Sequence, residues 1–593
     1  MMNARKHGVF LLILLVGIFV RIIFMSYHGL SNDELSAWYR AGFTSWNEFW
    51  YFGVSHGDMH PVFYQALLWC WIRFFGDSDW IIRIPSLLFF VANMLLIYHI
   101  ARKHFSDQSA YLPLILYLGS SFLIVNTTLA RPYNSGSFFI LLAFLSILEI
   151  AQSHKRSLKW IFVLMFAFLG AMLSHYFAFL TAAVLGLLAL IMLENRKRLD
   201  VVIAGFLAVI AFLPHLTVTL HQLNRGGLQW LAPPSWNWFL QVVVQLMNNS
   251  VWLSLLLLLI VVIAIFKKNQ AAKNTLAFRL AWLLFFCVLF LGYAVSYFFT
   301  PVLRELVVLF ILPFPLMALG HVLQWSKQFS LAVGIMLLSH SFTSDSILGF
   351  HHFGDFKYLS KEINAIHAKF GYDSITHAAN TNNVVYINYY IKEDLTEKIK
   401  NWDDPKTVNQ LYARVQLAKT PYFLYVLNNA YHSEQFLEVI RSRYPIILLN
   451  KRFGNTRLLL FEQKVGAQNN TPIIQSKSSN AEFSADQTLA ISSFKKTGKV
   501  FFITSKSKVE GVGPVYAVVT MERKGKQLMS GEFPTLYQTF DINQKFKGNT
   551  KIGNAYLGFE LPASYQPSDV IKVFIWNPNR LSVWSGKWEI GQR

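Results

Sequence analysis

The sequence predicts a polytopic α-helical membrane protein with about 11 transmembrane helices, followed by a soluble C-terminal region. Of the 593 residues, 54% are hydrophobic and only 14% are charged, which is not the balance of a soluble protein. Apolar runs of about 20 residues, the length that crosses a bilayer, recur through the first part of the chain. Basic clusters occupy the short gaps between these runs, as cytoplasmic loops do, at 102–103, 155–156, 196–198 and 267–273.

The first apolar run, Gly8 to Ser26, follows Arg5 and Lys6 as in a signal peptide. It lacks a small-residue cleavage site and is followed by further runs, so we expect a retained transmembrane helix. The expected spans are 8–26, 80–101, 110–127, 135–152, 159–174, 177–194, 200–214, 237–266, 277–299, 303–322 and 328–348.

The run at 61–75 is short for a span and carries Trp69, Trp71 and Arg73, which suit an interface. Counting it as a span would reverse every later loop against the positive-inside rule, so we expect a helix lying on the outer surface.

The net charge of +21 is explained by the basic clusters of the cytoplasmic loops, and no nucleic-acid partner is predicted. The two cysteines, Cys70 and Cys287, indicate neither a disulfide framework nor a metal cluster.

Residues 1–350 form the predicted membrane domain, with an outer loop at 27–79. A soluble α/β domain is expected at 351–464, because strand-like runs at 383–390, 421–427, 444–450 and 457–463 interleave with helical stretches such as 433–443. The polar segment 465–490 reads as a linker, and the helix-free strand pattern of 491–593 predicts a β-sandwich.

Polar residues converge on the outer face of the predicted membrane domain: Asp33, Glu34, Asp58, His60, Arg131, His175, Arg225 and Arg304. Polar groups near a membrane are costly and tend to mark function. Carboxylates beside histidines and arginines fit a reaction in which a hydroxyl loses a proton while an anion leaves, with Asp33 as general base and Arg131 or Arg304 as phosphate clamps. The alternative for "NDE" at 32–34 is a helix cap made by Asn32 or Asp33.

Several motifs of the first 350 residues occur in order. They are Asp33-Glu34, then Asp58-Met59-His60-Pro61, Phe75-Gly76 and Arg83-Ile84-Pro85-Ser86, then "ARPYNSG" around Arg131 and Tyr133, "SHYFAFL" at His175-Tyr176, and "LRELVVLFILPFPLMALG". This series resembles the GT-C membrane glycosyltransferases, in the branch related to protein O-mannosyltransferases and the lipid A aminoarabinose transferase. The chain departs from the family pattern at Val62, His215 and Glu305.

The resemblance implies a GT-C fold and an inverting transfer of a sugar from a polyprenyl-phosphate carrier to a glycan, lipid or protein acceptor at the outer face. It implies catalytic roles for Asp33, for Glu34, which would position the loop, and for Asp58, which would orient His60 or the acceptor. The donor phosphate would meet His60, Arg131 and Arg304, and the substrates Tyr133, His175 and Tyr176. No cofactor is firmly predicted, and a divalent cation near Asp33 and Asp58 stays open.

The expected location is a bacterial inner membrane with the C-terminal domains in the periplasm. Two alternatives remain: a transporter or flippase of lipid-linked glycans, and a membrane-anchored binding protein. Single residues have alternatives too. Arg83 would snorkel to the interface, His175 would serve in packing, and Glu305 would be only the ion-pair partner of Arg304.

Overall fold

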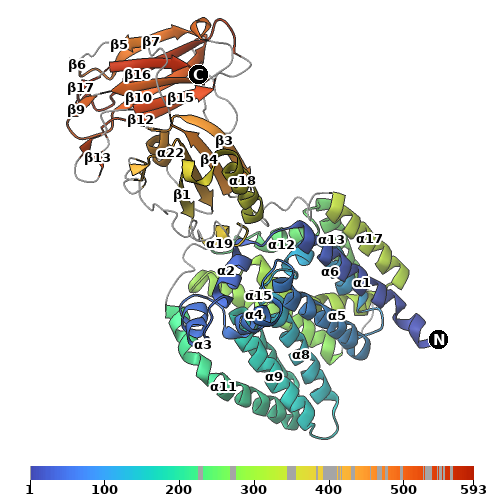
Figure 1. Cartoon of the computed structure of the whole chain (residues 1–593). Coiled ribbons are helices and arrows are strands. Elements are labelled where there is room, and N and C mark those ends of the chain that lie inside the picture. Colours follow the sequence, from blue (N-terminus) through green and yellow to red (C-terminus); the bar gives the residue numbers. More distant parts are fainter. Residues whose placement is uncertain are drawn as a thin grey trace. The chain divides into compact units, whose positions relative to one another are not determined.

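The computed structural model divides into two compact units, Met1–Gly354 and Asp355–Arg593 (Figure 1). The described residues are 2–224, 232–266, 275–343 and 355–592, the last range without 382–384, 392–410, 412–413, 416, 429–433, 442, 454–455, 464–470, 475–477, 495–498, 506, 525, 528–536, 544, 547–549, 552–554, 561–564 and 586.

The first unit is a helical membrane domain. In its described part, five helical segments are long and apolar enough to cross a membrane: His7–Tyr27 of α1 (Met2–Tyr27), Ile81–His104, α8 (Tyr133–Gln152), α11 (Asn195–Asn224) and α15 (Leu276–Phe298). The segment Ile81–His104 comprises the 3-10 turn η2 (Ile81–Arg83) and α5 (Ile84–His104). A sixth span results if α12 (Trp238–Leu246) and α13 (Val251–Phe266), which meet at 104°, are counted together.

Shorter helices complete this unit. The apolar ones are α4 (Val62–Phe75), α9 (Leu158–Ser174), α10 (Tyr176–Met192) and α16 (Pro313–Leu323). The others are α2 (Asn32–Ala41), α3 (Trp46–Glu48), the π-helical η1 (Phe49–Ser55), α6 (Tyr111–Gly119), α7 (Ser121–Asn126), the 3-10 helix η3 (Glu305–Phe310) and α17 (Lys327–Thr343).

The structure thus supports a helical membrane protein with five or six candidate spans plus shorter apolar helices, fewer than the predicted eleven. The expected span 110–127 is broken between α6 and α7, and 303–322 begins with η3 rather than with α-helix. In contrast, α11 extends well beyond 200–214 although it contains Pro214, because neighbouring groups in a membrane domain can satisfy the backbone that a proline frees.

Asn248 joins the two broken membrane helices. It lies between α12 and α13 in the left-handed conformation, with φ of 58°. Its Oδ1 accepts from the backbone N of Ser121 at 2.6 Å, and its Nδ2 donates to the carbonyls of Gly119 at 3.0 Å and Leu337 at 2.9 Å. Backbone groups in an apolar layer need such partners, so Asn248, together with the Ser341 hydroxyl that also donates to the Gly119 carbonyl, makes the break between α6 and α7 tolerable.

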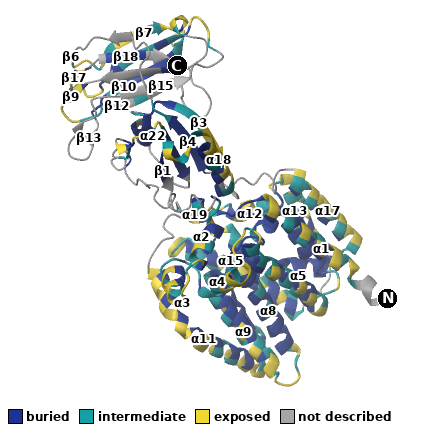
Figure 2. Ribbon diagram, viewed as in Figure 1, coloured by how far each residue is buried: buried dark blue, intermediate teal, exposed yellow. Residues whose placement is uncertain are grey.

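Close packing fixes the position of α8 in the first unit. Most residues of α8 are buried, and its apolar side chains belong to the large hydrophobic core of this unit (Figure 2). A Cβ atom at Gly170 of α9 would lie 2.3 Å from the ring of Phe139. A Cβ at Gly136 of α8 would lie 2.5 Å from the ring of Phe310 in η3. The helix that begins just after Arg131 is therefore held on two sides by contacts that allow no larger residue.

The second unit begins with a four-stranded sheet in the order β1-β2-β4-β3, made of β1 (Ile375–Thr381), β2 (Tyr422–Asn428), β3 (Ile446–Phe453) and β4 (Thr456–Glu462). β1 and β2 are parallel, with Ile375 opposite Tyr422, and the other pairs are antiparallel. Its helices include α18 (Asp355–Phe370) and α22 (Glu434–Arg441). The strand predicted at 383–390 is wrong, because Val385–Asn388 form the helical turn α19.

Two larger antiparallel sheets follow, with strand orders β11-β10-β16-β7, where β12 also pairs with β10, and β15-β8-β18-β5. Alternate residues of β16, namely Ile571, Val573 and Ile575, share one buried cluster with Trp588 of β18. The strands are β5 (Thr471–Ile474), β7 (Phe483–Ala490), β8 (Lys499–Ser505), β10 (Tyr516–Arg523), β11 (Lys526–Gln527), β12 (Tyr537–Asp541), β15 (Ala555–Glu560), β16 (Val570–Trp576) and β18 (Lys587–Gln592).

Two small sheets accompany them, β6-β17-β9 and β13-β14. They consist of β6 (Ser478–Ser479), β9 (Lys508–Glu510), β13 (Lys545–Phe546), β14 (Thr550–Lys551) and β17 (Ser582–Trp584). Because β5, β6 and β7 lie within 465–490, the prediction of a linker there is corrected: much of that segment is part of the sheets.

The Asn248 bonds give a first prediction. Asn248→Ala should lower the free energy of unfolding by about 1–3 kcal/mol for each backbone group left without a partner. The control is Asn249→Ala, because Asn249 also has a left-handed φ, 57°, but is exposed. Thermal unfolding in detergent measures both, and an equal loss in the two variants would contradict the assignment.

Candidate active site

The ends of several membrane helices meet at one end of the first unit. The carboxyl end of α1, the amino ends of α5 and α8, the α9–α10 junction and the carboxyl end of α11 all contribute contacts there. The segment 28–60 packs over these ends and contains α2 and η1. Residues that are far apart in sequence therefore share one site.

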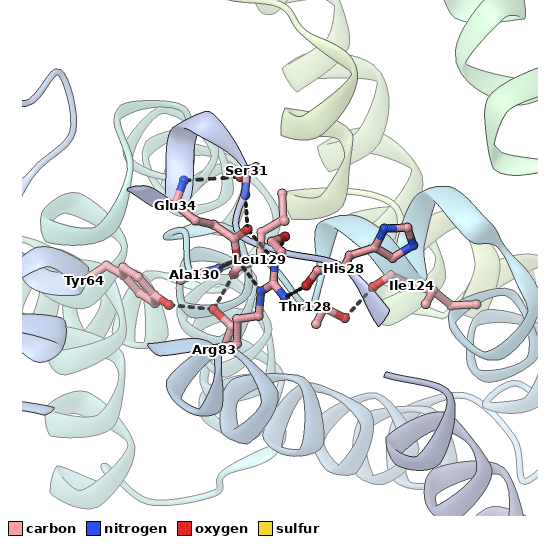
Figure 3. Close-up of polar contacts among 11 residues, drawn as sticks. His28, Ser31, Glu34, Tyr64, Arg83, Ile124, Thr128, Leu129 and Ala130 are labelled. Carbon is pink, nitrogen blue, oxygen red and sulfur yellow. Dashed lines mark hydrogen bonds and ion pairs between the residues drawn. The ribbon is translucent and has the colours of Figure 1, made fainter. Parts of the chain in front are cut away.

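Ser31 and Glu34 form a capping box at the start of α2. The Ser31 hydroxyl accepts from the backbone N of Glu34 at 3.2 Å, and Glu34 Oε2 accepts from the backbone N of Ser31 at 2.9 Å (Figure 3). The cap expected from sequence exists, but Ser31 makes it rather than Asn32 or Asp33. Asp33 lies in the first turn with an exposed side chain.

Glu34 and Arg83 form a buried ion pair in which both side chains are 0% exposed. Arg83 Nε lies 2.7 Å from Oε1 of Glu34, and Nη2 lies 2.8 Å from Oε2 (Figure 3). Arg83 also donates to the carbonyls of His28 and Gly29, while Oε1 of Glu34 accepts from the backbone N of Ala130 at 3.0 Å. The pair ties α1, α2, α5 and the segment before α8 together.

Burial alone would raise the pKa of the Glu34 carboxyl, but the charge of Arg83 and the hydrogen bonds hold it below its ordinary value. A buried carboxylate with both oxygens engaged has no free lone pair directed at a substrate. The geometry therefore argues against a catalytic role for Glu34 and for the positioning role. It also excludes the alternative in which Arg83 snorkels to the interface, since the side chain is fully buried.

Asp58 contacts two basic side chains, and a third basic side chain contacts one of these two. Oδ1 of Asp58 lies 3.1 Å from Nη1 of Arg40 and 3.0 Å from Nδ1 of His60. Nη2 of Arg131 lies 3.2 Å from Nδ1 and 3.4 Å from Nε2 of the same imidazole. A His60 tautomer that donates from Nδ1 to Asp58 and accepts at Nε2 from Arg131 satisfies both neighbours.

The charges in this cluster shift the pKa values of one another. Burial would raise the pKa of Asp58, but Arg40, His60 and Arg131 hold it well below its ordinary value. Burial and then the charge of Arg131 lower the pKa of His60, which favours the neutral ring. Burial would lower the pKa of Arg131, but the charges of Asp33 and Asp58 raise it. The negative charge of Asp33 thus acts on Arg131, the arginine predicted to bind the donor phosphate.

His175 forms one wall of the cluster. Its ring centroid lies 5.0 Å from that of His60, 5.7 Å from Tyr133 and 5.1 Å from Phe310. Its Nδ1 also accepts from the backbone N of Phe177 at 3.0 Å and so caps α10. Burial, followed by the neighbouring His60 and the charge of Arg131, lowers the pKa of His175 well below its ordinary value. Packing and site contact are combined in one residue.

Tyr176 reaches the cluster through α11. Its hydroxyl donates to Oε1 of Gln222, and Nε2 of Gln222 donates to the carbonyls of Val54 at 3.0 Å and His60 at 3.3 Å. Tyr176 therefore supports the backbone of the loop that carries His60. Sequence reasoning did not single out Gln222, which lies on α11.

Arg304 is not part of this cluster. Its side chain is 47% exposed, and its polar partner within the described structure is the neighbouring Glu305, at 3.7 Å. Glu305 in turn accepts from Nε1 of Trp238 at 3.2 Å. Arg225 lies outside the described residues. The cation that the structure adds is Arg40, which the sequence could have indicated, because it follows Asp33 by seven residues and so shares a face of α2.

Glu34 gives a second prediction. Glu34→Gln should lower the free energy of unfolding by about 3–5 kcal/mol at neutral pH, because Arg83 would remain buried without a counter-ion. The folded-state pKa of Glu34 lies below its ordinary value of 4.5, so the ion pair stabilises fully above that pH and its contribution is lost as the pH falls through the folded-state pKa. The gap between wild type and variant should therefore narrow in acid.

The control for this prediction is Glu48→Gln. Glu48 also closes a capping box, with Ser45, but its side chain is exposed. Chemical unfolding of both variants between neutral and acidic pH measures the difference. Equal and small losses in the two variants would show that the Glu34–Arg83 pair adds nothing beyond the cap.

Among the described residues, no group of three or more His, Cys, Asp or Glu side chains is arranged to hold a metal ion.

ArnT from Cupriavidus metallidurans in the apo state matches with a TM-score of 0.51 at 11% identity, over 76% of this chain and 98% of that one. The same protein bound to undecaprenyl phosphate matches with a TM-score of 0.49 at 11% identity, over 77% and 98%. An Archaeoglobus fulgidus oligosaccharyltransferase tethered with an acceptor peptide matches with a TM-score of 0.40 at 10% identity, over 99% and 96%.

No curated protein matches the chain in sequence. At such low identity, apo ArnT shows a shared fold. Residues 59–218, which include His60, Arg131 and His175, match the family described as dolichyl-phosphate-mannose-protein mannosyltransferase. The resemblance to GT-C membrane glycosyltransferases is thereby confirmed: residues 59–218 match this mannosyltransferase family, and the chain shares a fold with ArnT.

Proposed function

We propose that the protein is an inverting glycosyltransferase that moves a sugar from a polyprenyl-phosphate carrier to an acceptor hydroxyl. The reaction would take place at the periplasmic face of a bacterial inner membrane, with the second unit on the same side. One observation carries the proposal: an exposed carboxylate, Asp33, lies in the field of a buried cationic cluster at the ends of the membrane helices.

The cationic cluster suits the phosphate of the donor. Arg40 and Arg131 are held by Asp58 and His60, so their guanidinium groups are fixed before a ligand arrives. Fixed cations stabilise the charge that grows on a leaving phosphate without reorganising during the reaction. We assign the phosphate site to Arg40, His60 and Arg131, and we leave Arg304 out because its partner is Glu305.

Asp33 suits the role of general base. Its side chain is exposed, so an acceptor can reach it, whereas Glu34 and Asp58 are buried and paired. Asp33 would take the proton of the acceptor hydroxyl while the oxygen forms a bond to the anomeric carbon. The bond from that carbon to the phosphate oxygen would break, and its electron pair would leave with the polyprenyl phosphate. Attack opposite the leaving group inverts the anomeric carbon.

The position of the site fits a lipid donor. An isoprenoid tail is held in the bilayer by about 0.8 kcal/mol per buried CH₂, so the carrier phosphate stays at the membrane surface. The cluster lies at the ends of helices that are long and apolar enough to span the membrane. The phosphate could thus meet Arg131 while the tail stays among lipids.

Asp33→Asn should reduce turnover by about 100-fold or more, because the amide cannot accept the acceptor proton. The measurement is sugar release from a panel of polyprenyl-phosphate sugars by purified protein in lipid vesicles. Asp77→Asn is the control, since Asp77 is an exposed carboxylate of the same loop that accepts a hydrogen bond from Trp38. Movement of lipid-linked glycan across the bilayer without release would indicate a transporter instead.

Variants of Arg131 and Arg304 distinguish the phosphate site proposed from the structure, which excludes Arg304, from the one expected from the sequence, which includes it. Arg131→Lys should raise the KM for the donor by about tenfold or more, because lysine keeps the charge but loses the planar fork. Arg304→Lys should leave that KM within about twofold. Steady-state kinetics at varied donor concentration measures both, and the reverse order of effects would return Arg304 to the site.

A further inference from the structure

Arg21 is a charged side chain buried inside the membrane unit. It lies on α1 with 0% exposure, and its guanidinium carbon is 3.6 Å from the ring centroid of Phe90. Its partners in the described structure are neutral oxygens, with no carboxylate among them: the Thr127 hydroxyl and the carbonyls of Gly17 and Tyr117. A buried cation without an anion is costly in a membrane, and such residues usually serve function.

Two of the four hydrogen bonds that Arg21 makes to described residues, including the shortest, are made to Thr127. Nε and Nη2 of Arg21 both donate to Oγ1 of Thr127, at 3.0 and 2.8 Å. The same hydroxyl donates to the carbonyl of Leu123 at 2.6 Å. Its proton and both lone pairs are then engaged, so the Thr127 side chain has one orientation. Charge-assisted bonds of this kind are about twice as strong as neutral ones.

Thr127 begins the segment that ends at Arg131. Side chains from three other places hold its successive residues: Ser86 of α5 donates to the carbonyl of Leu129 at 2.6 Å, Glu34 accepts from the backbone N of Ala130, and Asn134 of α8 donates to the carbonyl of Thr127. Figure 3 shows the Leu129 and Ala130 end of this segment beside Arg83. Arg21 attaches the start of this segment to α1, because it binds Thr127. Thr127 directly follows α7, the short helix that begins after the break at Ser120.

We propose that Arg21 is a positioning residue for the donor phosphate, acting through Thr127 on Arg131. The inference rests on the proposed function, because it assumes that Arg131 contacts that phosphate. Arg21 holds the start of a five-residue segment whose last side chain must meet His60 at 3.2 Å. If the start is released, Arg131 has more arrangements to choose from, and binding the phosphate must then restrict them.

The test measures binding of undecaprenyl phosphate to the purified full-length protein in lipid nanodiscs. Thr127→Val removes the acceptor for Arg21 at nearly constant shape, and Thr127→Ser restores it. Thr181→Val is the matched control, because Thr181 is equally buried and makes the same type of bond, to the carbonyl of Phe177 at 2.8 Å, away from Arg21. Arg21→Lys keeps the charge but loses the paired donors, and Arg131→Lys gives the reference loss.

We expect Thr127→Val and Arg21→Lys to weaken binding about tenfold, the loss of a hydrogen bond to a charged group, while Thr127→Ser and Thr181→Val stay within about twofold. A structural role alone would lower the unfolding temperature without changing the Kd of the folded fraction. Wild-type affinity in Thr127→Val, with a loss in Arg131→Lys, would overturn the inference.

Wild-type affinity in Arg131→Lys would overturn the phosphate assignment of the proposed function instead. Should Thr127→Val fail to fold, Arg21→Lys decides by the same comparison against Thr181→Val.

Discussion

The site depends on the buried ion pair between Glu34 and Arg83. Neighbouring residues on a helix point about 100° apart, so placing Glu34 against Arg83 directs Asp33 to a different side of α2. Of the two neighbouring carboxylates, Glu34 is thus fully buried and structural, while Asp33 is exposed. The same ion pair holds the carbonyls of His28 and Gly29 at the end of α1 and the backbone N of Ala130 next to Arg131. The ion pair therefore sets the positions of both the proposed base, Asp33, and the proposed phosphate-binding cation, Arg131.

Around Asp58 the balance of charge favours an anionic ligand. Among the buried side chains, one carboxylate, Asp58, faces two arginines and a histidine that is kept neutral, so these groups hold positive charge in excess, and the second carboxylate near Arg131 is the exposed Asp33. Buried charges are normally paired, and an excess of this kind is stabilised when a phosphate arrives. The neutral His60 also matters: its Nε2 can accept from Arg131 only while it is unprotonated, which keeps the guanidinium in place.

The sequence predicted the composition of the site better than its internal roles. Asp33, Asp58, His60, Arg131 and His175 were expected together because alternating helices bring their connections to the same side. Contacts join Asp58, His60, Arg131 and His175, whereas Asp33 acts on Arg131 through its charge. Hydropathy could not locate the breaks at Ser120 and Asn248, because these depend on side chains that satisfy backbone groups from distant helices. Nor could it show that Glu34 is saturated by four donors, or that Arg304 pairs locally. In the second unit, the apolar pattern of 383–390 indicated a strand, yet Val385–Asn388 are helical, since short apolar runs do not distinguish the two.

The placement of Asp33 and Arg40 on one short helix has a mechanistic consequence. Seven residues of α-helix rise about 10.5 Å and return to nearly the same face, so the backbone fixes the spacing of the proposed base and the proposed phosphate-binding cation. An inverting displacement needs these groups on opposite sides of the anomeric carbon, with a sugar ring between them. A rigid helix provides that separation more reliably than two loops would, because it does not depend on how the loops order when substrate binds. The capping box of Ser31 and Glu34, by fixing where α2 begins, also fixes where along it both groups stand.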